Sequence, residues 1–309
     1  MLGVLLNFIK KIVFWPRIRK YRIIHVHRKT AEYCNRLIKS YDDGDIAYNL
    51  LPKKVLKDKK IIWQYWGQGF EDSEIPLLVR KCLSSVDKYC DTDEYEIIRL
   101  SDKNFSEYVD FPKCIVDKLE KIPKAFFSDL LRCCLLSIYG GCWLDTTVLL
   151  TGRISERYWK QNFFLFQRDN SECNKEYWEN AFAYYYGWGE EFKVKVLSSV
   201  FFSHRGNEFV VDLRNILLFF LEKNNKLPTY FFFQILFNEL LEVKYKNFNC
   251  VLEGDCIPHY LQQILNDDNF HIASLEETLK LTTIHKLTYK IEGNYERLVK
   301  LLDEYYLSR

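Results

Sequence analysis

The sequence lacks the short motifs that identify several common enzyme classes. It contains no GxGxxG stretch and no P-loop, whose backbone amides would hold a dinucleotide or a nucleotide phosphate. No arrangement of Ser, His and Asp stands out as a hydrolase triad. Nothing in the chain therefore supports hydrolase or kinase chemistry. Internal repeats and low-complexity segments are absent as well.

Cysteine pairs at metal-binding spacing are also absent. None of the ten cysteines belongs to a CxxC pair, and Cys133 and Cys134 are neighbours inside a helix that we predict to be buried. A chain of 309 residues is too long to be a small secreted disulfide scaffold. These features argue against a metal cluster and indicate free thiols in a reducing cytosol.

No apolar run is long enough to span a bilayer. Six apolar residues near the N-terminus follow helical spacing, namely Leu2, Leu5, Leu6, Ile9, Ile12 and Val13. Eight Lys or Arg lie between Lys10 and Lys29, and no acid precedes Glu32. A cleaved signal peptide would have its bases before its apolar core, which is the reverse order. Residues 1–29 therefore favour an interfacial helix with a basic segment on anionic lipid, with docking on the protein's own core as the alternative.

Composition allows one large domain or two small ones. Hydrophobic residues make up 48% of the chain, enough for a sizeable core, and aromatic residues make up 17%. Aromatic rings often line carbohydrate sites, although most of these rings are expected to pack in the core. The net charge of +2 argues against a nucleic-acid partner.

Local patterns predict alternating strands and helices. Two apolar strands, Ile61–Trp63 and Tyr95–Leu100, flank a helix from about Pro76 to Tyr89, which implies that the strands are parallel. The other predicted elements are a helix and a strand within residues 125–150, a strand at 163–167, and helices at 208–224 and 229–245. We therefore predict an α/β fold with an open, mostly parallel sheet that binds its ligand at the carboxyl ends of the strands.

The segment Ala125–Leu150 carries the strongest functional pattern. It predicts an amphipathic helix, a stop at Gly140-Gly141, a short apolar strand and a polar break that begins at Asp145. Asp129 and Arg132 are three residues apart and share one helix face. Asp145 could merely cap a turn, and Asp129 with Arg132 could be an ordinary surface pair. Their apolar surroundings favour instead a site that holds a sugar on a metal-bound diphosphate.

This segment resembles the core signature of a known family. The resemblance is carried by Ser128-Asp129, Leu131-Arg132, Leu135, Tyr139-Gly140-Gly141 and Trp143-Leu144-Asp145. It extends to residues 61–67, Pro76, residues 82–84, 228–231 and 285–288. The sequence is similar to the capsular polysaccharide synthesis glycosyltransferases. Those enzymes are relatives of the DxD-containing sugar transferases, which include yeast mannosyltransferases and the large clostridial glucosylating toxins. The resemblance implies the GT-A fold.

The resemblance also implies roles for individual residues. Asp129 and Arg132 would contact the sugar hydroxyls of the donor, and Asp145 would hold the metal or the ribose and phosphate. Trp63 could stack on a uracil ring or pack in the core, and Ser128 could contact the donor or cap its helix. The other residues expected to contact the donor are Gln64, Gly141, Trp143 and Lys286.

The expected metal site departs from the family pattern. The usual Asp-x-Asp is Asp145-Thr146-Thr147 in this sequence, and a threonine hydroxyl is a neutral, poorer ligand for a hard cation. We expect Mn²⁺ or Mg²⁺ at Asp145 and Thr147, with His285 as a late ligand. The metal would neutralise the charge of the departing diphosphate.

Taken together, these features predict a hexosyltransferase-type enzyme of bacterial type. It would move a sugar from a UDP-sugar to a capsular or cell-surface glycan on a lipid carrier, with retention of anomeric configuration. The alternative is a nucleotide-sugar-binding or scaffold subunit without turnover, which Thr147 favours. We expect it to lie peripherally on the cytoplasmic face of the cell membrane. The predicted divisions are a membrane-surface segment at 1–29, a helical lead-in at 30–60, a nucleotide-sugar-binding core at 61–200 and a helical acceptor-side lobe at 201–309.

Overall fold

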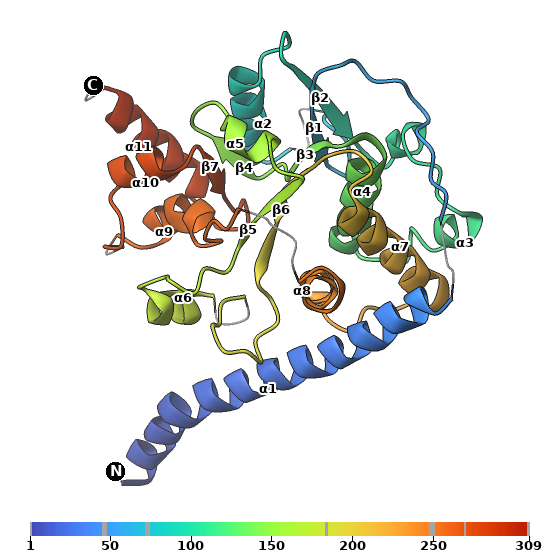
Figure 1. Ribbon diagram of the computed structural model, residues 1–309. Coiled ribbons are helices and arrows are strands. Elements are labelled where there is room, and N and C mark those ends of the chain that lie inside the picture. The colour runs from blue at the N-terminus through green and yellow to red at the C-terminus, as the bar shows by residue number, and fades with distance from the viewer. Residues whose placement is uncertain are drawn as a thin grey trace.

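The computed structural model describes residues 2–44, 48–71, 75–182, 185–246, 251–268 and 270–307, with the backbone alone for residues 2–17. Its centre is a five-stranded sheet in the order β2-β1-β3-β6-β5 (Figure 1). The strands are β1 (Lys60–Tyr65), β2 (Tyr95–Leu100), β3 (Gly141–Leu144), β5 (Phe163–Gln167) and β6 (Val196–Ser203). β1 is parallel to β2 and β3, whereas β6 is antiparallel to β3 and β5. Four strands share one direction, which confirms the predicted open, mostly parallel sheet.

Helices cover both faces of this sheet. One face packs against α4 (Lys124–Tyr139), α7 (Glu208–Lys223) and α8 (Phe232–Lys244), and the other against α2 (Leu77–Tyr89) and α5 (Glu156–Trp159). Successive residues of β1 are buried on alternate faces, because Trp63 belongs to the first core cluster and Ile62 to the second. A strand that is buried on both sides reads as a continuous apolar run, as the sequence does here. The shorter elements η1 (Phe105–Glu107), α3 (Lys113–Val116) and α6 (Lys175–Ala181) lie in the connections.

A second, two-stranded sheet brings the C-terminal part of the chain to the centre. β4 (Val148–Leu150) pairs antiparallel with β7 (Ile284–Lys286). Figure 1 shows the C-terminal helices gathered beside β7, and they are α9 (Tyr260–Asn266), α10 (Leu275–Leu281) and α11 (Asn294–Leu307), preceded by η2 (Ile257–His259). We expected a helical lobe that completes the domain over residues 201–309. Within this stretch, α7 and α8 cover the central sheet, and the elements after α8 include the strand β7.

The N-terminal segment is one continuous helix, α1 (Leu2–Asp42), so the predicted boundary between residues 29 and 30 falls inside a helix. From Ile23 to Tyr41 its buried residues recur every three or four positions and pack against the core that contains α7 and α8. His27 is also buried, and its Nδ1 accepts a hydrogen bond from the Lys193 backbone N–H at 3.4 Å. This part of α1 therefore docks on the protein's own core. None of the helices in the described residues is long and apolar enough to cross a membrane.

The turn between α4 and β3 needs both of its glycines. Gly140 has a φ of 75° and Gly141 a φ of 103°, a region that other residues rarely adopt. A Cβ atom on Gly141 would lie 2.6 Å from the carbonyl oxygen of Ile61, so only glycine lets β3 approach β1 this closely. The turn starts β3 at the amino edge of the sheet, and its four residues deliver Asp145 to the carboxyl edge.

Candidate active site

Asp145 lies directly after β3, and both of its carboxylate oxygens accept hydrogen bonds. Oδ1 accepts from Trp143 Nε1 at 2.8 Å and from Arg132 Nη2 at 3.1 Å. Oδ2 accepts from Lys286 Nζ at 3.1 Å. Backbone bonds to Ser199 and Val148 fix the turn that carries it. With 27% of its side chain exposed, Asp145 is reachable by a ligand while two cations hold it.

The predicted pair on α4 forms the inner part of the same cluster. Arg132 Nη1 donates to Asp129, and Arg132 Nη2 donates to Ser128 Oγ at 3.2 Å. The guanidinium is only 3% exposed and lies over the ring of Trp143, with 5.0 Å between its carbon and the ring centroid. Arg132 Nε has no hydrogen-bond partner within the described part of the chain. The structure thus brings Asp129, Arg132 and Asp145 together, as the sequence predicted.

The two acids of the cluster titrate differently. Burial raises the pKa of Asp129 to about 7, against the opposing effect of Arg132. Burial also acts on Asp145, but the charges of Lys286 and Arg132 outweigh it and hold the Asp145 pKa below its usual value. At neutral pH the cluster therefore combines a charged Asp145 with an Asp129 that can gain a proton.

Lys286 reaches the cluster from the opposite strand of the small sheet. Its register partner in β4 is Val148, and its ammonium donates to Thr147 Oγ1 as well as to Asp145. His285 precedes it and points to the other side, because side chains alternate along a strand. His285 is fully buried, lies 3.0 Å from Thr151 Oγ1 through Nε2, and has its pKa lowered by burial to about 3. Of the predicted metal ligands, the structure places Asp145 and Thr147 together and His285 apart from them.

Other predicted donor contacts lie in supporting positions. Trp63 is fully buried and donates from Nε1 to the Gly140 carbonyl at 2.9 Å. Gln64 is also fully buried, and it accepts a hydrogen bond from Arg99. Ser128 accepts from Arg132 and does not cap its helix, since α4 begins after Pro123. Trp143 is buried beneath Arg132, so it supports Asp145.

A family comparison bears on this arrangement. The model of the family described as "Capsular polysaccharide synthesis protein" matches residues 15–306. The chain belongs to this family. Membership supports a glycosyltransferase, the class of enzyme predicted from the sequence.

Solved structures also match the chain, whereas curated proteins do not. The solved structure titled "PaToxG Glycosyltransferase" matches with 14% sequence identity and a TM-score of 0.38, over 73% of this chain and 80% of that chain.

In this member of the capsular polysaccharide synthesis family, the residues around Asp145 fit a divalent cation poorly. Within the described ranges, no group of three His, Cys, Asp or Glu side chains is placed to hold a metal ion. Hard cations bind through several oxygen ligands, mostly charged ones. Thr147 supplies a neutral hydroxyl where a second acid would stand, and Lys286 already contacts both Asp145 and Thr147.

Two aromatic residues near this edge were not selected from the sequence. Trp66 follows β1 directly, is half-buried, and packs edge-on against Tyr289 with their ring centroids 5.6 Å apart. Its position just after the apolar strand that contains Trp63 is the signal that could have identified it, since ligands bind at the carboxyl ends of the strands in such sheets. Tyr230 precedes α8, is 73% exposed, and interacts electrostatically with Asp129 and Asp145.

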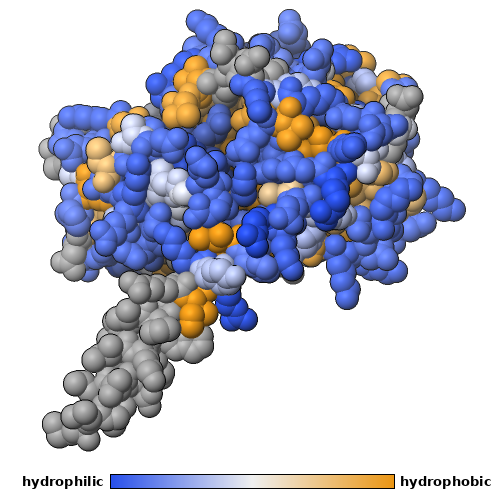
Figure 2. Space-filling view, turned by 60° about the horizontal axis from the view of Figure 1, so that its bottom comes forward, coloured by the Kyte–Doolittle hydropathy of each residue, from blue (hydrophilic) through white to orange (hydrophobic). Residues whose placement is uncertain are grey.

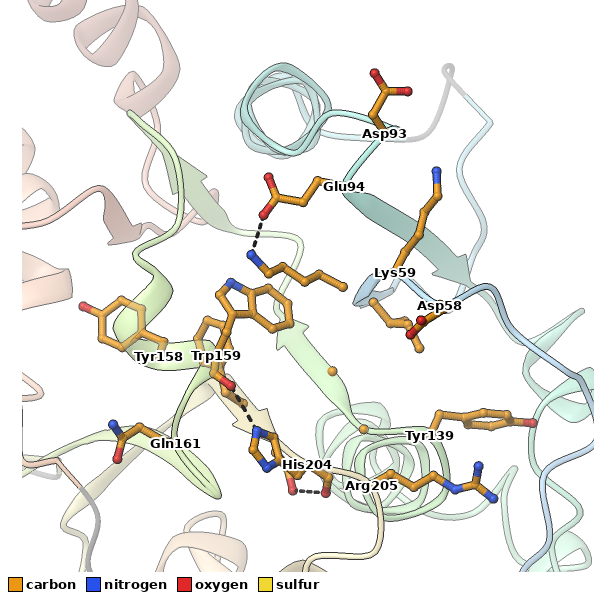
Figure 3. Close-up of a pocket in the computed structure, with 16 residues that line it drawn as sticks. Asp58, Lys59, Asp93, Glu94, Tyr139, Tyr158, Trp159, Gln161, His204 and Arg205 are labelled. Carbon is orange, nitrogen blue, oxygen red and sulfur yellow. Dashed lines mark hydrogen bonds and ion pairs between the residues drawn. The ribbon is translucent and has the colours of Figure 1, made fainter.

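A cavity of about 610 Å³ lies at the opposite end of the sheet (Figure 3). It is bordered by the residues before β1 and β2, by the α4–β3 turn and by the end of β6. Gly141, which we expected to contact the donor, lines this cavity. The four residues of β3 separate it from Asp145. Trp159 and Arg205 border the cavity from different elements in Figure 3, and none of the Asp145 cluster takes part.

Proposed function

We propose that the protein transfers a sugar from a nucleoside-diphosphate sugar, and from a UDP-sugar in particular, to a capsular or cell-surface glycan. The observation that carries this proposal is the cluster after β3, in which Arg132 joins Asp129 to Asp145 and Lys286 contacts Asp145 from β7. Two carboxylates beside two cations can bind both halves of such a donor. The carboxylates accept hydrogen bonds from sugar hydroxyls, and the cations attract the diphosphate.

The nucleoside would lie along the carboxyl edge of the sheet. Trp66, which is half-buried at the end of β1, would stack on the base, and Tyr289 supports its ring. The sugar would then reach Asp129 and Asp145, where a fixed orientation lowers the barrier to transfer. We propose retention of configuration, as the resemblance to retaining enzymes implies.

The acceptor would be a glycan on a lipid carrier at an anionic membrane surface, on its cytoplasmic face. Support comes from the excess of Lys and Arg between Lys10 and Lys29 and from the helix α1 that carries them. In the described side chains of α1, Tyr21 is 70% exposed, and Lys20 pairs only with the partly exposed Glu179 at 3.1 Å. The N-terminal end of α1 would make the contact with lipid.

A panel of nucleotide-sugars tests this proposal. Purified protein is mixed with each donor, and release of the free nucleoside diphosphate is measured with and without a lipid-linked glycan acceptor. We expect one donor to be hydrolysed slowly alone and faster with the acceptor. Donor binding without any turnover would favour the second candidate, a non-catalytic subunit, to which Thr147 in place of an acid points. Absence of both binding and turnover for every donor would contradict both.

A further inference from the structure

The Lys286 ammonium lies between Asp145 and Thr147, the two positions whose side chains would bind the metal in an Asp-x-Asp site. Its Nζ atom lies 3.1 Å from Asp145 Oδ2 and also donates to Thr147 Oγ1. The pairing of β4 with β7 sets this position, because Lys286 is in register with Val148, the residue after Thr147. The neighbouring backbone holds the same register through a bond of 3.0 Å from the Leu287 N–H to the Thr147 carbonyl. Backbone pairing between two strands therefore places the lysine in the site.

The negative charge of Asp145 is already balanced by neighbouring cations. Asp145 has a cation on each carboxylate oxygen, and Arg132 also pairs with Asp129. A divalent cation bound to Asp145 Oδ2 would lie next to the Lys286 ammonium, and at about 4 Å two like charges repel strongly in a partly buried site. With Thr147 in place of an acid, this position supplies no carboxylate to offset that repulsion. Metal binding at this point would require Lys286 to leave.

We propose that the Lys286 ammonium takes the place of the divalent cation in binding and stabilising the leaving diphosphate. This inference rests on the proposed glycosyl transfer. In that step the bond between the anomeric carbon and the diphosphate oxygen breaks, and its electron pair stays on the diphosphate. The acceptor hydroxyl oxygen forms the new bond to the anomeric carbon, and its proton passes to a phosphate oxygen. Lys286 stays protonated and neutralises the developing charge together with Arg132.

Binding of UDP, GDP, dTDP and ADP, measured calorimetrically in EDTA and again in Mn²⁺, tests this assignment without a turnover assay. We expect the preferred nucleotide to bind the wild type equally well in both. Lys286→Ala should weaken that binding about 10- to 100-fold in EDTA, because a charge-assisted hydrogen bond is lost. Lys286→Arg should restore part of it. Lys290→Ala is the matched control, since that lysine is exposed four residues further on, and it should bind like the wild type.

A reconstructed metal site provides the complementary test. The double variant Thr147→Asp with Lys286→Ala should bind nucleotide only when Mn²⁺ is present, and it should bind Mn²⁺ alone more tightly than the wild type. Wild-type binding that requires Mn²⁺, or a Lys286→Ala protein with unchanged affinity in EDTA, would overturn the role of Lys286 while leaving the proposed function intact. If no nucleoside diphosphate binds under either condition, the result contradicts the proposed function and also the role of Lys286 that rests on it.

Discussion

Asp145 is the residue on which the proposed site depends most. Its carboxylate accepts hydrogen bonds from Trp143, Arg132 and Lys286, so it positions two cations at the carboxyl edge of the sheet. Replacing it would release Lys286 and loosen Arg132. Arg132 would still be paired with Asp129, and the fold should therefore survive the change.

We expect Asp145→Ala to lower kcat/KM for transfer by at least about 100-fold, because preorganised charge near the reacting bond is lost. Asp145→Asn keeps the volume and should show a similar loss. Initial rates with the best donor measure the effect, and circular dichroism confirms folding. A folded Asp145→Ala protein with near-normal activity would contradict the assignment.

The buried Asp129 predicts a pH-dependent stability. Its folded-state pKa of about 7 lies above the value for an unfolded chain, so protonation favours the fold and that contribution disappears as the pH rises through 7. Between about pH 6 and about pH 8, the free energy of unfolding of the wild type should fall by on the order of 1 kcal/mol relative to Asp129→Asn. Urea denaturation at both pH values provides the measurement. The same pH dependence in both proteins would show that Asp129 does not titrate between these two pH values.

Trp63 and Trp66 offer a matched comparison between core and site. Trp66→Ala should weaken nucleotide binding about 10-fold, the scale of one base–aromatic stack, with a small effect on stability. Trp63→Ala removes a fully buried ring and should lower the free energy of unfolding by about 3–5 kcal/mol. Calorimetry measures nucleotide affinity and thermal melts measure stability, so the two methods together distinguish a binding role from a core role. Equal nucleotide affinity in Trp66→Ala and the wild type would place the base elsewhere.

At the scale of the elements, α1 has a docked part and an N-terminal part. Ile23, His27 and Tyr41 are buried, and Asn35 donates to Glu239 at 2.7 Å from the docked part. Figure 2 shows where α1 meets the rest of the surface, with an orange hydrophobic patch beside blue hydrophilic residues. Deleting residues 1–29, the whole of the predicted membrane segment, would also remove the contacts of Ile23 and His27.

A deletion of residues 2–17 is the better test of membrane attachment. It removes Lys10, Lys11 and Arg17 together with the apolar stripe, and bases near anionic lipid contribute about 1 kcal/mol each. We expect binding to phosphatidylserine vesicles to fall at least tenfold while the melting temperature is kept. Higher salt should weaken wild-type binding without abolishing it, because apolar contacts are not screened. Unchanged sedimentation with vesicles would locate the membrane site elsewhere, and a lower melting temperature would show that the segment supports the fold.

At the scale of the whole molecule, the site is assembled from distant parts of the chain. Lys286 meets Asp145 across 141 positions and Thr147 across 139. The Asp145 cluster and the cavity beside Gly141 lie at opposite edges of one sheet, although a single short strand joins them. Changes at the α4–β3 turn should therefore act on stability first, since Gly141 has no room for a side chain.

Local information was enough for part of the elements and for the first half of the site, whereas β6, β7 and the helices after α8 were not predicted. Tyr95–Leu100 and Phe163–Gln167 are strands with the predicted bounds, because β propensity and short apolar runs are properties of neighbouring residues. Asp129 and Arg132 meet as predicted, since an i, i+3 spacing on a helix places them together without further information. Gly140 and Gly141 likewise take the positive φ angles that their turn requires.

Long-range packing decided the rest, because pairing between distant strands depends on which faces are buried and on the register. The sequence by itself determined that an acid follows β3 and that His285 and Lys286 are adjacent. Only the β4–β7 register selected Lys286 to face Asp145 and turned His285 to the buried side. Trp63 lies within β1, which is buried on both faces, whereas Trp66 follows the end of that strand and is half-buried. Sequence identifies which chemical groups are available, whereas tertiary burial determines which of them a ligand can reach.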